Sequence, residues 1–221
     1  MIESVTKPLR VVLLGPPASG KGTQGRKLAA ALGLGYLGTG ALLRENVEEG
    51  SDLGKEAEPI LARGAYLPDE LMCSILADWL GRQDGGWVLD GFPRSLSQAV
   101  FLDDWLAKRR LKLDAAIFLD VPMEVLLERI HDRVECSSCR WSGSRNQRLE
   151  GGKCPVCGDP AGPRSDDSDE NFRSRHAEFE SLTQPVISRY RQLGMLYSCD
   201  ASASQDEVAS KLLQIVANRS V

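Results

Sequence analysis

The sequence has little of several features that mark specialised classes of protein. Its 221 residues include only two histidines, His131 and His176, and 6% are aromatic. No apolar run approaches the roughly eighteen residues that span a bilayer, and residues 1–10 lack the apolar core of a signal peptide. We therefore expect a cytoplasmic protein without a membrane partner.

An excess of positive charge is also missing. Lys and Arg number 27 against 31 Asp and Glu, which gives a net charge of −4 and a pI near 5.4. Proteins that bind nucleic acid through bulk electrostatics are usually basic, so we expect no nucleic-acid partner. The 42% of hydrophobic and 26% of charged residues are ordinary for a globular protein and exclude disorder as the main state.

Short apolar runs alternate with longer amphipathic stretches along most of the chain. The runs predict buried strands at residues 11–14, 36–37, 87–89, 115–119 and 195–197. The stretches predict helices at residues 21–32, 40–48, 53–62, 69–80, 96–109, 124–133, 170–193 and 205–218. Strands that alternate with helices predict an α/β fold, in which helices cover both faces of a parallel sheet. Ligands of such sheets bind at the carboxyl ends of the strands.

One segment, residues 134–169, departs from this alternation. It is rich in Gly, Ser, Pro, Cys and Arg and shows no sustained helical period. The chain length fits one compact unit with a sizeable insertion better than two independent domains. We therefore expect residues 1–221 to form a single unit that carries this insertion.

The segment GPPASGKGT, residues 15–23, follows a predicted strand and precedes a predicted helix. It matches Gly-x-x-x-x-Gly-Lys in the strand–loop–helix context that a phosphate-binding loop requires. The backbone N–H groups of such a loop and the helix N-terminus hold phosphate oxygens. Lys21 can then reach the β and γ phosphates, and Thr23 can face magnesium. The alternative, a glycine-rich turn without a ligand, explains less of this context.

Asp90 ends the predicted strand at residues 87–89. An aspartate that leaves a parallel strand beside a phosphate-binding loop is placed to hold magnesium, directly or through water. We therefore expect Thr23 and Asp90 to hold the magnesium of a bound nucleotide.

Four of the six cysteines form two Cys-x-x-Cys pairs inside the insertion, Cys136 with Cys139 and Cys154 with Cys157. The spacing is typical of a zinc ribbon, in which four thiolates close a tetrahedral site and leave no open position for chemistry. Because the insertion is poor in apolar residues, we expect structural zinc in place of a hydrophobic core. Cys73 and Cys199 are expected to be ordinary buried residues.

Several motifs in order along nearly the whole chain carry a family resemblance. Besides residues 15–23, they are Thr39-Gly40-x-x-x-Arg44, Asp90-Gly91-Phe92-Pro93-Arg94 with Gln98, Arg129-x-x-x-Arg133, and Arg164-Ser165-Asp166-Asp167 with Arg175. With them the chain resembles the adenylate kinases and, more broadly, the nucleoside monophosphate kinases. The cysteine-bearing insertion resembles that of the bacterial long form.

This resemblance implies a P-loop kinase fold with a five-stranded parallel sheet and two appendages. These are a nucleotide-monophosphate-binding (NMP-binding) insertion at 38–67 and a zinc-ribbon-like lid at 130–167. It also implies a monomeric enzyme, an ATP:AMP phosphotransferase, which moves the γ-phosphoryl group of Mg-ATP reversibly to AMP and gives two ADP.

The resemblance also implies the site residues. The catalytic set is Lys21, Asp90, Arg94, Arg133, Arg164 and Arg175. The ATP site is Gly15, Ala18, Ser19, Gly20, Lys21, Gly22, Thr23, Arg129, Arg133 and Ala203. The AMP site is Thr39, Gly40, Arg44, Ala65, Tyr66, Leu67, Gly91, Phe92, Pro93, Arg94, Gln98, Arg164 and Arg175. Gln98 would read the adenine edge, and Asp166 and Asp167 would orient arginines of the lid.

The chain departs from the family pattern in three places. Ala18 replaces a loop glycine, which predicts a negative φ at that residue. Ala41 replaces an acidic residue that helps to hold magnesium waters, and residues 140–144 differ from the segment that the family places against the ATP base. These departures leave open a kinase of the same fold with a UMP or CMP acceptor or a GTP donor. A non-catalytic, nucleotide-gated zinc-ribbon binding protein is the remaining alternative.

Overall fold

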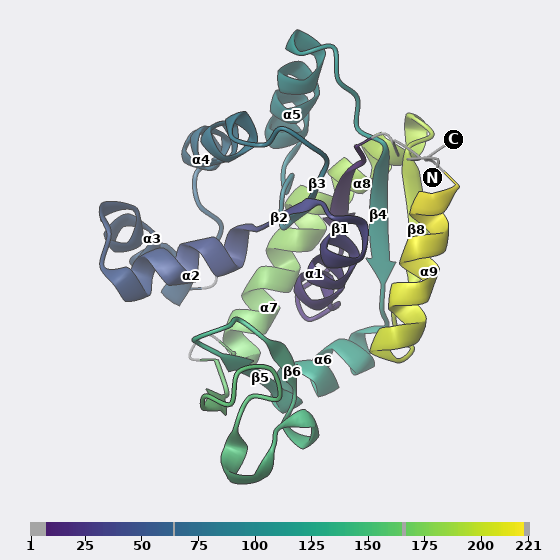
Figure 1. The fold of residues 1–221 in the computed structure, drawn as a ribbon. Helices are drawn as coiled ribbons and strands as arrows, with labels where there is room; N and C mark the ends of the chain where they lie inside the picture. Colours follow the sequence, from purple (N-terminus) through teal and green to yellow (C-terminus); the bar gives the residue numbers. More distant parts are fainter. Residues whose placement is uncertain (1–7, 64, 165–166, 219–221) are drawn as a thin grey trace.

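The computed structural model describes residues 8–63, 65–164 and 167–218 (Figure 1). Five parallel strands form a sheet in the order β2-β3-β1-β4-β8. Their bounds are β1 (Arg10–Leu14), β2 (Gly35–Gly38), β3 (Trp87–Asp90), β4 (Ala115–Asp120) and β8 (Leu196–Asp200). The predicted five-stranded parallel sheet is therefore confirmed.

Nine helices accompany these strands in the described part of the chain. They are α1 (Lys21–Leu32), α2 (Thr39–Glu49), α3 (Asp52–Ala62), α4 (Asp69–Gly81), α5 (Leu96–Lys108), α6 (Met123–Asp132), α7 (Asp169–Glu178), α8 (Gln184–Gln192) and α9 (Gln205–Ala217). None of these helices combines the length and apolar character needed to cross a membrane. The helix predicted over 170–193 is confirmed as one continuous helical stretch, although a π-helical turn at Phe179–Thr183 joins α7 to α8. Pro185 follows this turn and has no N–H to continue a regular α-helical ladder.

The side chains of β1 alternate between two buried clusters, one on each face of the sheet. Val12 and Leu14 pack in the cluster that α4, α5 and α8 cover. Val11 and Leu13 pack in the cluster that α1 and α9 cover. Successive side chains of a strand point to opposite faces, so the four consecutive apolar residues of β1 require cover on both faces of the sheet. The expected helices on both faces are confirmed.

The insertion forms a separate small antiparallel sheet, which lies below α1 in Figure 1. Its strands are β5 (Arg133–Cys136), β6 (Ser142–Ser144) and β7 (Ala161–Gly162), with 3₁₀ turns at Arg145–Gln147 and Glu150–Gly152. Its buried cluster contains only Cys136, Cys154 and Ala161, with Cys139 and Trp141 packed against it. This confirms that the insertion lacks a hydrophobic core of ordinary size.

Candidate active site

A cavity of about 560 Å³ opens at the carboxyl ends of β1 and β3. Of the residues predicted for the nucleotide sites, those that line it are Gly15, Ala18, Ser19, Gly20, Lys21, Gly22, Thr23, Gly40, Arg44, Ala65, Tyr66, Asp90, Gly91, Pro93, Arg94, Arg129, Arg133, Arg164, Arg175 and Ala203. An adjoining smaller cavity is lined by Thr39, Leu67 and Gln98 together with residues of the first. Phe92 is the exception, because its side chain is fully buried in the core.

The loop between β1 and α1 has a backbone suited to an anion. A Cβ at Gly15 would lie 2.9 Å from the carbonyl oxygen of Leu119, so the loop can turn there only with glycine. Gly20 caps α1 with a φ of 93° and without a side-chain hydrogen bond, and the first turn of α1 contains no acidic residue. The N–H groups at this end of α1 are therefore available to phosphate oxygens, as the sequence predicted.

Lys21 lies folded over the same loop. Its Nζ donates hydrogen bonds of 2.8 Å to the carbonyl oxygens of Gly15 and Pro16. Loss of solvent lowers the pKa of Lys21 to about 8, although the neighbouring Asp90 carboxylate opposes this shift. The ammonium group is therefore still mostly protonated at pH 7, and a phosphate would stabilise its charge further.

The expected negative φ at Ala18 is wrong. Ala18 has a φ of 64°, in the left-handed region that glycine adopts without strain. Its Cβ disfavours this conformation by about 1–2 kcal/mol relative to the right-handed one. The loop therefore carries local strain at Ala18 that a glycine would relieve.

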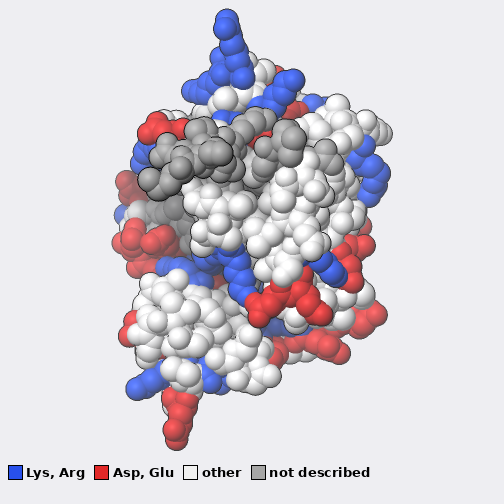
Figure 2. Space-filling model, turned by 45° about the vertical axis from the view of Figure 1, so that its right-hand side comes forward, with Lys and Arg blue, Asp and Glu red and all other residues white. Residues whose placement is uncertain are grey.

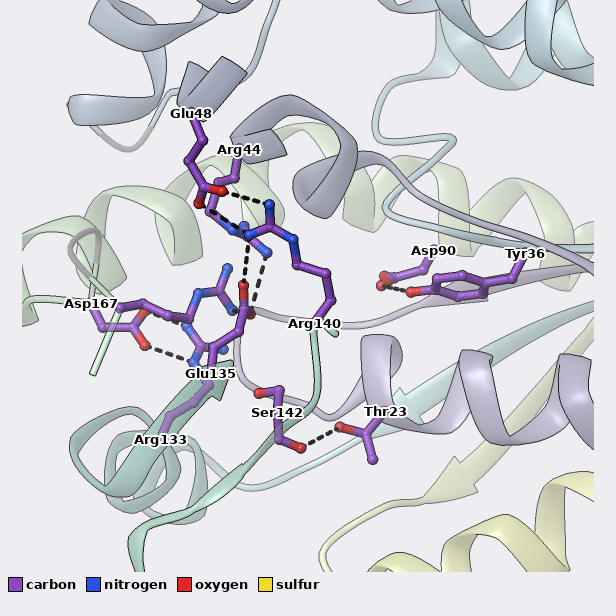
Figure 3. A network of polar contacts seen from close by, with 11 residues as sticks. Thr23, Tyr36, Arg44, Glu48, Asp90, Arg133, Glu135, Arg140, Ser142 and Asp167 are labelled. Carbon is purple, nitrogen blue, oxygen red and sulfur yellow. Dashed lines mark hydrogen bonds and ion pairs between the residues drawn. The ribbon is translucent and has the colours of Figure 1, made fainter. Parts of the chain in front are cut away.

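Asp90 lies against the start of α1. A Cβ on Gly22 would lie 3.3 Å from Asp90 Oδ2, and the hydroxyl of Tyr36 donates to the same oxygen over 3.1 Å (Figure 3). The ring of Tyr36 fits because Gly25 and Gly38 lack side chains: an added Cβ would come within 2.7 and 2.6 Å of Tyr36 atoms. The sequence reasoning missed Tyr36, and no motif links it to Asp90.

Arg94, Thr39 and Gly91 form a connected group at the end of β3. Arg94 Nε donates to the carbonyl oxygen of Gly91 over 2.7 Å, and Thr39 Oγ1 donates to the same oxygen over 3.0 Å. The guanidinium of Arg94 also lies over the ring of Tyr66, 4.2 Å from its centroid. These contacts hold one planar cation in a defined orientation at the junction of the two cavities.

The arginines predicted in the insertion pair with carboxylates of the same insertion. Arg133 Nε donates to Asp167 Oδ2 over 2.7 Å, and a second nitrogen of Arg133 binds the other oxygen of the same carboxylate. Asp167 thus orients an arginine, as predicted, whereas Asp166 lies outside the described residues. Arg164 and Arg44 contact Glu135 Oε2 at 3.4 and 3.5 Å. Glu135, which the sequence reasoning missed, brings together arginines that are far apart in the chain.

Arg140 connects the insertion directly with α2. Its guanidinium donates to both carboxylate oxygens of Glu48 on α2, over 3.1 and 2.7 Å (Figure 3). Arg140 has a φ of 58°, so an arginine occupies a backbone position that favours glycine. The hydroxyl of Thr23 forms a second contact with the insertion, a hydrogen bond of 3.4 Å to the carbonyl oxygen of Ser142. The insertion therefore lies over both α1 and α2.

Three further arginines line the main cavity. Arg129 donates to the carbonyl oxygens of Ala201, over 2.7 Å, and of Ser19. Arg175 reaches the cavity from α7. Arg26 also lines the cavity and lies over Tyr36, 5.2 Å from the ring centroid.

The four cysteines of the insertion form one cluster. The Sγ atoms of Cys136, Cys139, Cys154 and Cys157 all lie within 4.8 Å of one another. Cys136 and Cys157 are 3.5 Å apart, as are Cys139 and Cys154. Tetrahedral coordination with bonds of about 2.3 Å places sulfur atoms roughly 3.8 Å apart, so the four thiols fit a zinc ion.

Neither histidine of the described chain lines the main cavity. His131 is exposed and lies 2.6 Å from Asp169. His176 packs between the rings of Phe172 and Phe179. The described residues that line this cavity therefore include several cations and four acidic side chains, Asp90, Glu128, Asp132 and Glu135, but no histidine.

The strand order, the phosphate-binding loop after β1 and the arginines that converge above it define a P-loop kinase that acts on nucleotides. The family model of adenylate kinase matches residues 13–195. The chain is 38% identical to an adenylate kinase of Agathobacter rectalis over 212 residues, which are 94% of this chain and 99% of that protein.

Two further relatives give the same result. An adenylate kinase of Finegoldia magna is 37% identical, with 93% of this chain and 97% of that protein covered. An adenylate kinase of Moorella thermoacetica is 38% identical, with 88% and 91% covered. The chain belongs to the adenylate kinase family.

Proposed function

We propose that this protein transfers the γ-phosphoryl group of Mg-ATP reversibly to AMP and forms two molecules of ADP. The observation that carries the proposal is the composition of the main cavity. A phosphate-binding loop with an open helix N-terminus borders it on one side, and Arg44, Arg94, Arg133, Arg164 and Arg175 border the same space. Two nucleotides that meet by their phosphates require this distribution of positive charge.

The reaction needs no general base. An oxygen of the AMP phosphate, already ionised at pH 7, forms a bond to the γ phosphorus, while the bond from that phosphorus to the β–γ bridging oxygen breaks. The remaining requirement is to align both phosphates and to cancel their charge, which guanidinium groups and Lys21 do. The absence of a histidine among the described lining residues is consistent with this chemistry.

The proposed sites follow the two sides of the cavity. ATP lies on the loop at residues 15–23 and between Arg129 and Ala203. AMP lies against Thr39, Arg44 and Arg94, and its base enters the smaller cavity at Gln98.

Magnesium enters as part of the ATP substrate. The hydroxyl of Thr23 and the carboxylate of Asp90 would hold it, since both oxygen groups line the cavity beside the loop. The family's second acidic position holds Ala41 here, which leaves Asp90 as the main anionic ligand.

Tyr36→Phe is expected to raise the Mg²⁺ concentration required for half-maximal activity by about two- to tenfold, because one hydrogen bond to Asp90 is worth roughly 0.5–1.5 kcal/mol. The ring and its packing against Gly25 and Gly38 stay. Thermal stabilisation by ATP should weaken in the presence of Mg²⁺ and stay unchanged in its absence. Equal Mg²⁺ dependence of the variant and the wild type would contradict this role.

We further propose that residues 38–67 form the NMP-binding segment and residues 130–167 a lid, and that zinc on the four cysteines stiffens the lid. Closure of the lid would exclude water, which otherwise competes as the phosphoryl acceptor. The contact between Arg140 and Glu48 supports two segments that meet over the substrates. We also propose a cytoplasmic monomer that binds nucleotides and no nucleic acid. The face shown in Figure 2 carries both signs of charge rather than the continuous basic surface that favours nucleic acid.

A coupled assay of ADP formation from ATP, AMP and Mg²⁺ tests the function. We expect turnover that requires all three components, and Arg109→Ala, which changes an arginine stacked on Trp105 outside the cavity, should leave it unchanged. A protein without AMP-dependent turnover would contradict the proposal. A panel of ATP and GTP against AMP, UMP, CMP and GMP should show ATP and AMP as the preferred pair.

A further inference from the structure

Gln98 occupies a buried position at the acceptor end of the site. It lies in the first turn of α5, and only 2% of its surface is exposed. The same residue lines the smaller cavity with Thr39 and Met72. A buried amide that lines a cavity controls which ligand edge can bind there, because an unpaired buried polar group is costly.

The amide oxygen of Gln98 accepts from a group that can only donate, and the amide nitrogen donates to a group that can only accept. The backbone N–H of Arg94 donates to Gln98 Oε1 over 2.8 Å. Gln98 Nε2 donates to Asp69 Oδ1 over 2.6 Å. A backbone N–H can only donate and a carboxylate can only accept. If the amide were turned by 180°, its nitrogen would face the N–H of Arg94 and its oxygen would face the carboxylate of Asp69. These two partners therefore determine the orientation of the amide.

Asp69, which begins α4, is itself held in place. The hydroxyl of Ser95 donates to Asp69 Oδ2 over 2.6 Å, and the hydroxyl of Ser97 donates to the same oxygen. Burial raises the pKa of Asp69, but the hydrogen bonds from Ser95, Ser97 and Gln98 together outweigh it and lower the pKa below its usual range. The carboxylate therefore stays ionised at neutral pH and remains an acceptor.

A fixed amide offers the ligand one defined pattern. Gln98 keeps a second lone pair on Oε1 and a second hydrogen on Nε2. The pair matches the edge of a 6-aminopurine, which has an amino donor beside the N1 acceptor. A 6-oxopurine reverses both groups, since it has an oxygen acceptor beside an N1–H donor. Its acceptor would face the amide oxygen of Gln98, and its donor would face the amide nitrogen.

We propose that Asp69 is a specificity-determining residue, which fixes the amide of Gln98 so that the acceptor site selects 6-aminopurine over 6-oxopurine monophosphates. The inference rests on the proposed function and deepens it. Asp69 acts through Gln98 and is a positioning residue. Buried hydrogen-bonding sites of this kind reject a mismatched substrate far more strongly than apolar contacts do.

Asp69→Asn tests the proposal with AMP and IMP as acceptors and ATP as the constant donor. An asparagine can present either an acceptor or a donor to Gln98, so the amide can turn. We expect the ratio of kcat/KM for AMP to that for IMP to fall at least tenfold, through a higher KM for AMP and a lower KM for IMP. Asp69→Ala, which removes the carboxylate that accepts from Gln98 Nε2, should also lower the ratio of kcat/KM for AMP to that for IMP.

Ser97→Ala is the matched control, because it removes one hydrogen bond to Asp69 and leaves the Asp69–Gln98 contact in place. Its AMP/IMP ratio should equal that of the wild type. Calorimetric titration with AMP and IMP gives a second readout for a variant of low activity. An AMP/IMP ratio of kcat/KM that stays within twofold of the wild type in both Asp69 variants would overturn the inference. The proposed function would still stand in that case, provided that the wild type turns over AMP. A wild type without AMP turnover would overturn both.

Discussion

Arg133→Ala is expected to lower kcat by about 10²–10³, the usual effect of removing one donor that stabilises transition-state charge. Arg133 begins β5, only 16% of its side chain is exposed, and the carboxylate of Asp167 grips it through two nitrogens. Such an arginine is oriented before the substrate arrives, so little reorganisation is needed during the reaction. The KM values for ATP and AMP should change much less than kcat, because the lost interaction belongs mainly to the transition state.

The contributions of the charge and of the planar shape of Arg133 to kcat can be measured separately. Arg133→Lys keeps the charge but loses the planar fork that binds two oxygens, and its kcat should lie between those of the wild type and Arg133→Ala. Arg145→Ala is the control from the same insertion, because Arg145 is exposed and donates to the carbonyl oxygen of His131. Its kcat should match the wild type. A loss below tenfold in Arg133→Ala would exclude the role assigned to Arg133.

Loss of the metal from the cysteine cluster is expected to abolish most of the activity while the parallel sheet stays folded. The insertion has almost no apolar core, so metal–thiolate bonds would supply most of its folding free energy. Arg133, Arg164 and Ser142 all reach the main cavity from this insertion. Purified protein should contain about one zinc per chain, and a strong chelator should lower the melting temperature of the lid and the turnover together.

Substitution of single cysteines sharpens this experiment. Cys154→Ser removes a fully buried ligand and should eliminate bound zinc, whereas Cys73→Ser, outside the insertion, should retain it. Circular dichroism of Cys154→Ser should retain the helical signal of the core. Protein that contains no zinc, or that melts at the same temperature with and without chelator, would contradict the zinc-bound lid.

Much of the fold could be predicted because its signals are contiguous in the chain. The predicted helix at residues 21–32 matches α1, and the apolar runs at 11–14 and 115–119 lie within β1 and β4. The π-helical turn at Phe179–Thr183 could not be predicted, since the helical conformation continues across it. Pro185 was the available signal, but proline is also tolerated in the first turn of a helix.

Some residues of the candidate site could likewise be predicted from the sequence, and others could not. The phosphate-binding loop and the cysteine pairs are short patterns whose chemistry follows from residue type and spacing, whereas the roles of the arginine motifs are implied by the family resemblance. The φ of 64° at Ala18 could not be predicted, because a Cβ disfavours this conformation and the sequence does not show that the loop tolerates the strain.

The order of residues along the chain was sufficient for the α/β class, the phosphate-binding loop, the arginine motifs and the thiol pairs, because each depends on neighbours in sequence. Pairings between distant segments depended on the folded chain. These include Tyr36 with Asp90, Gln98 with Asp69, and Arg140 with Glu48. Hydrogen bonds act only over a few ångströms, and the packing of helices on the parallel sheet determines which polar side chains come that close.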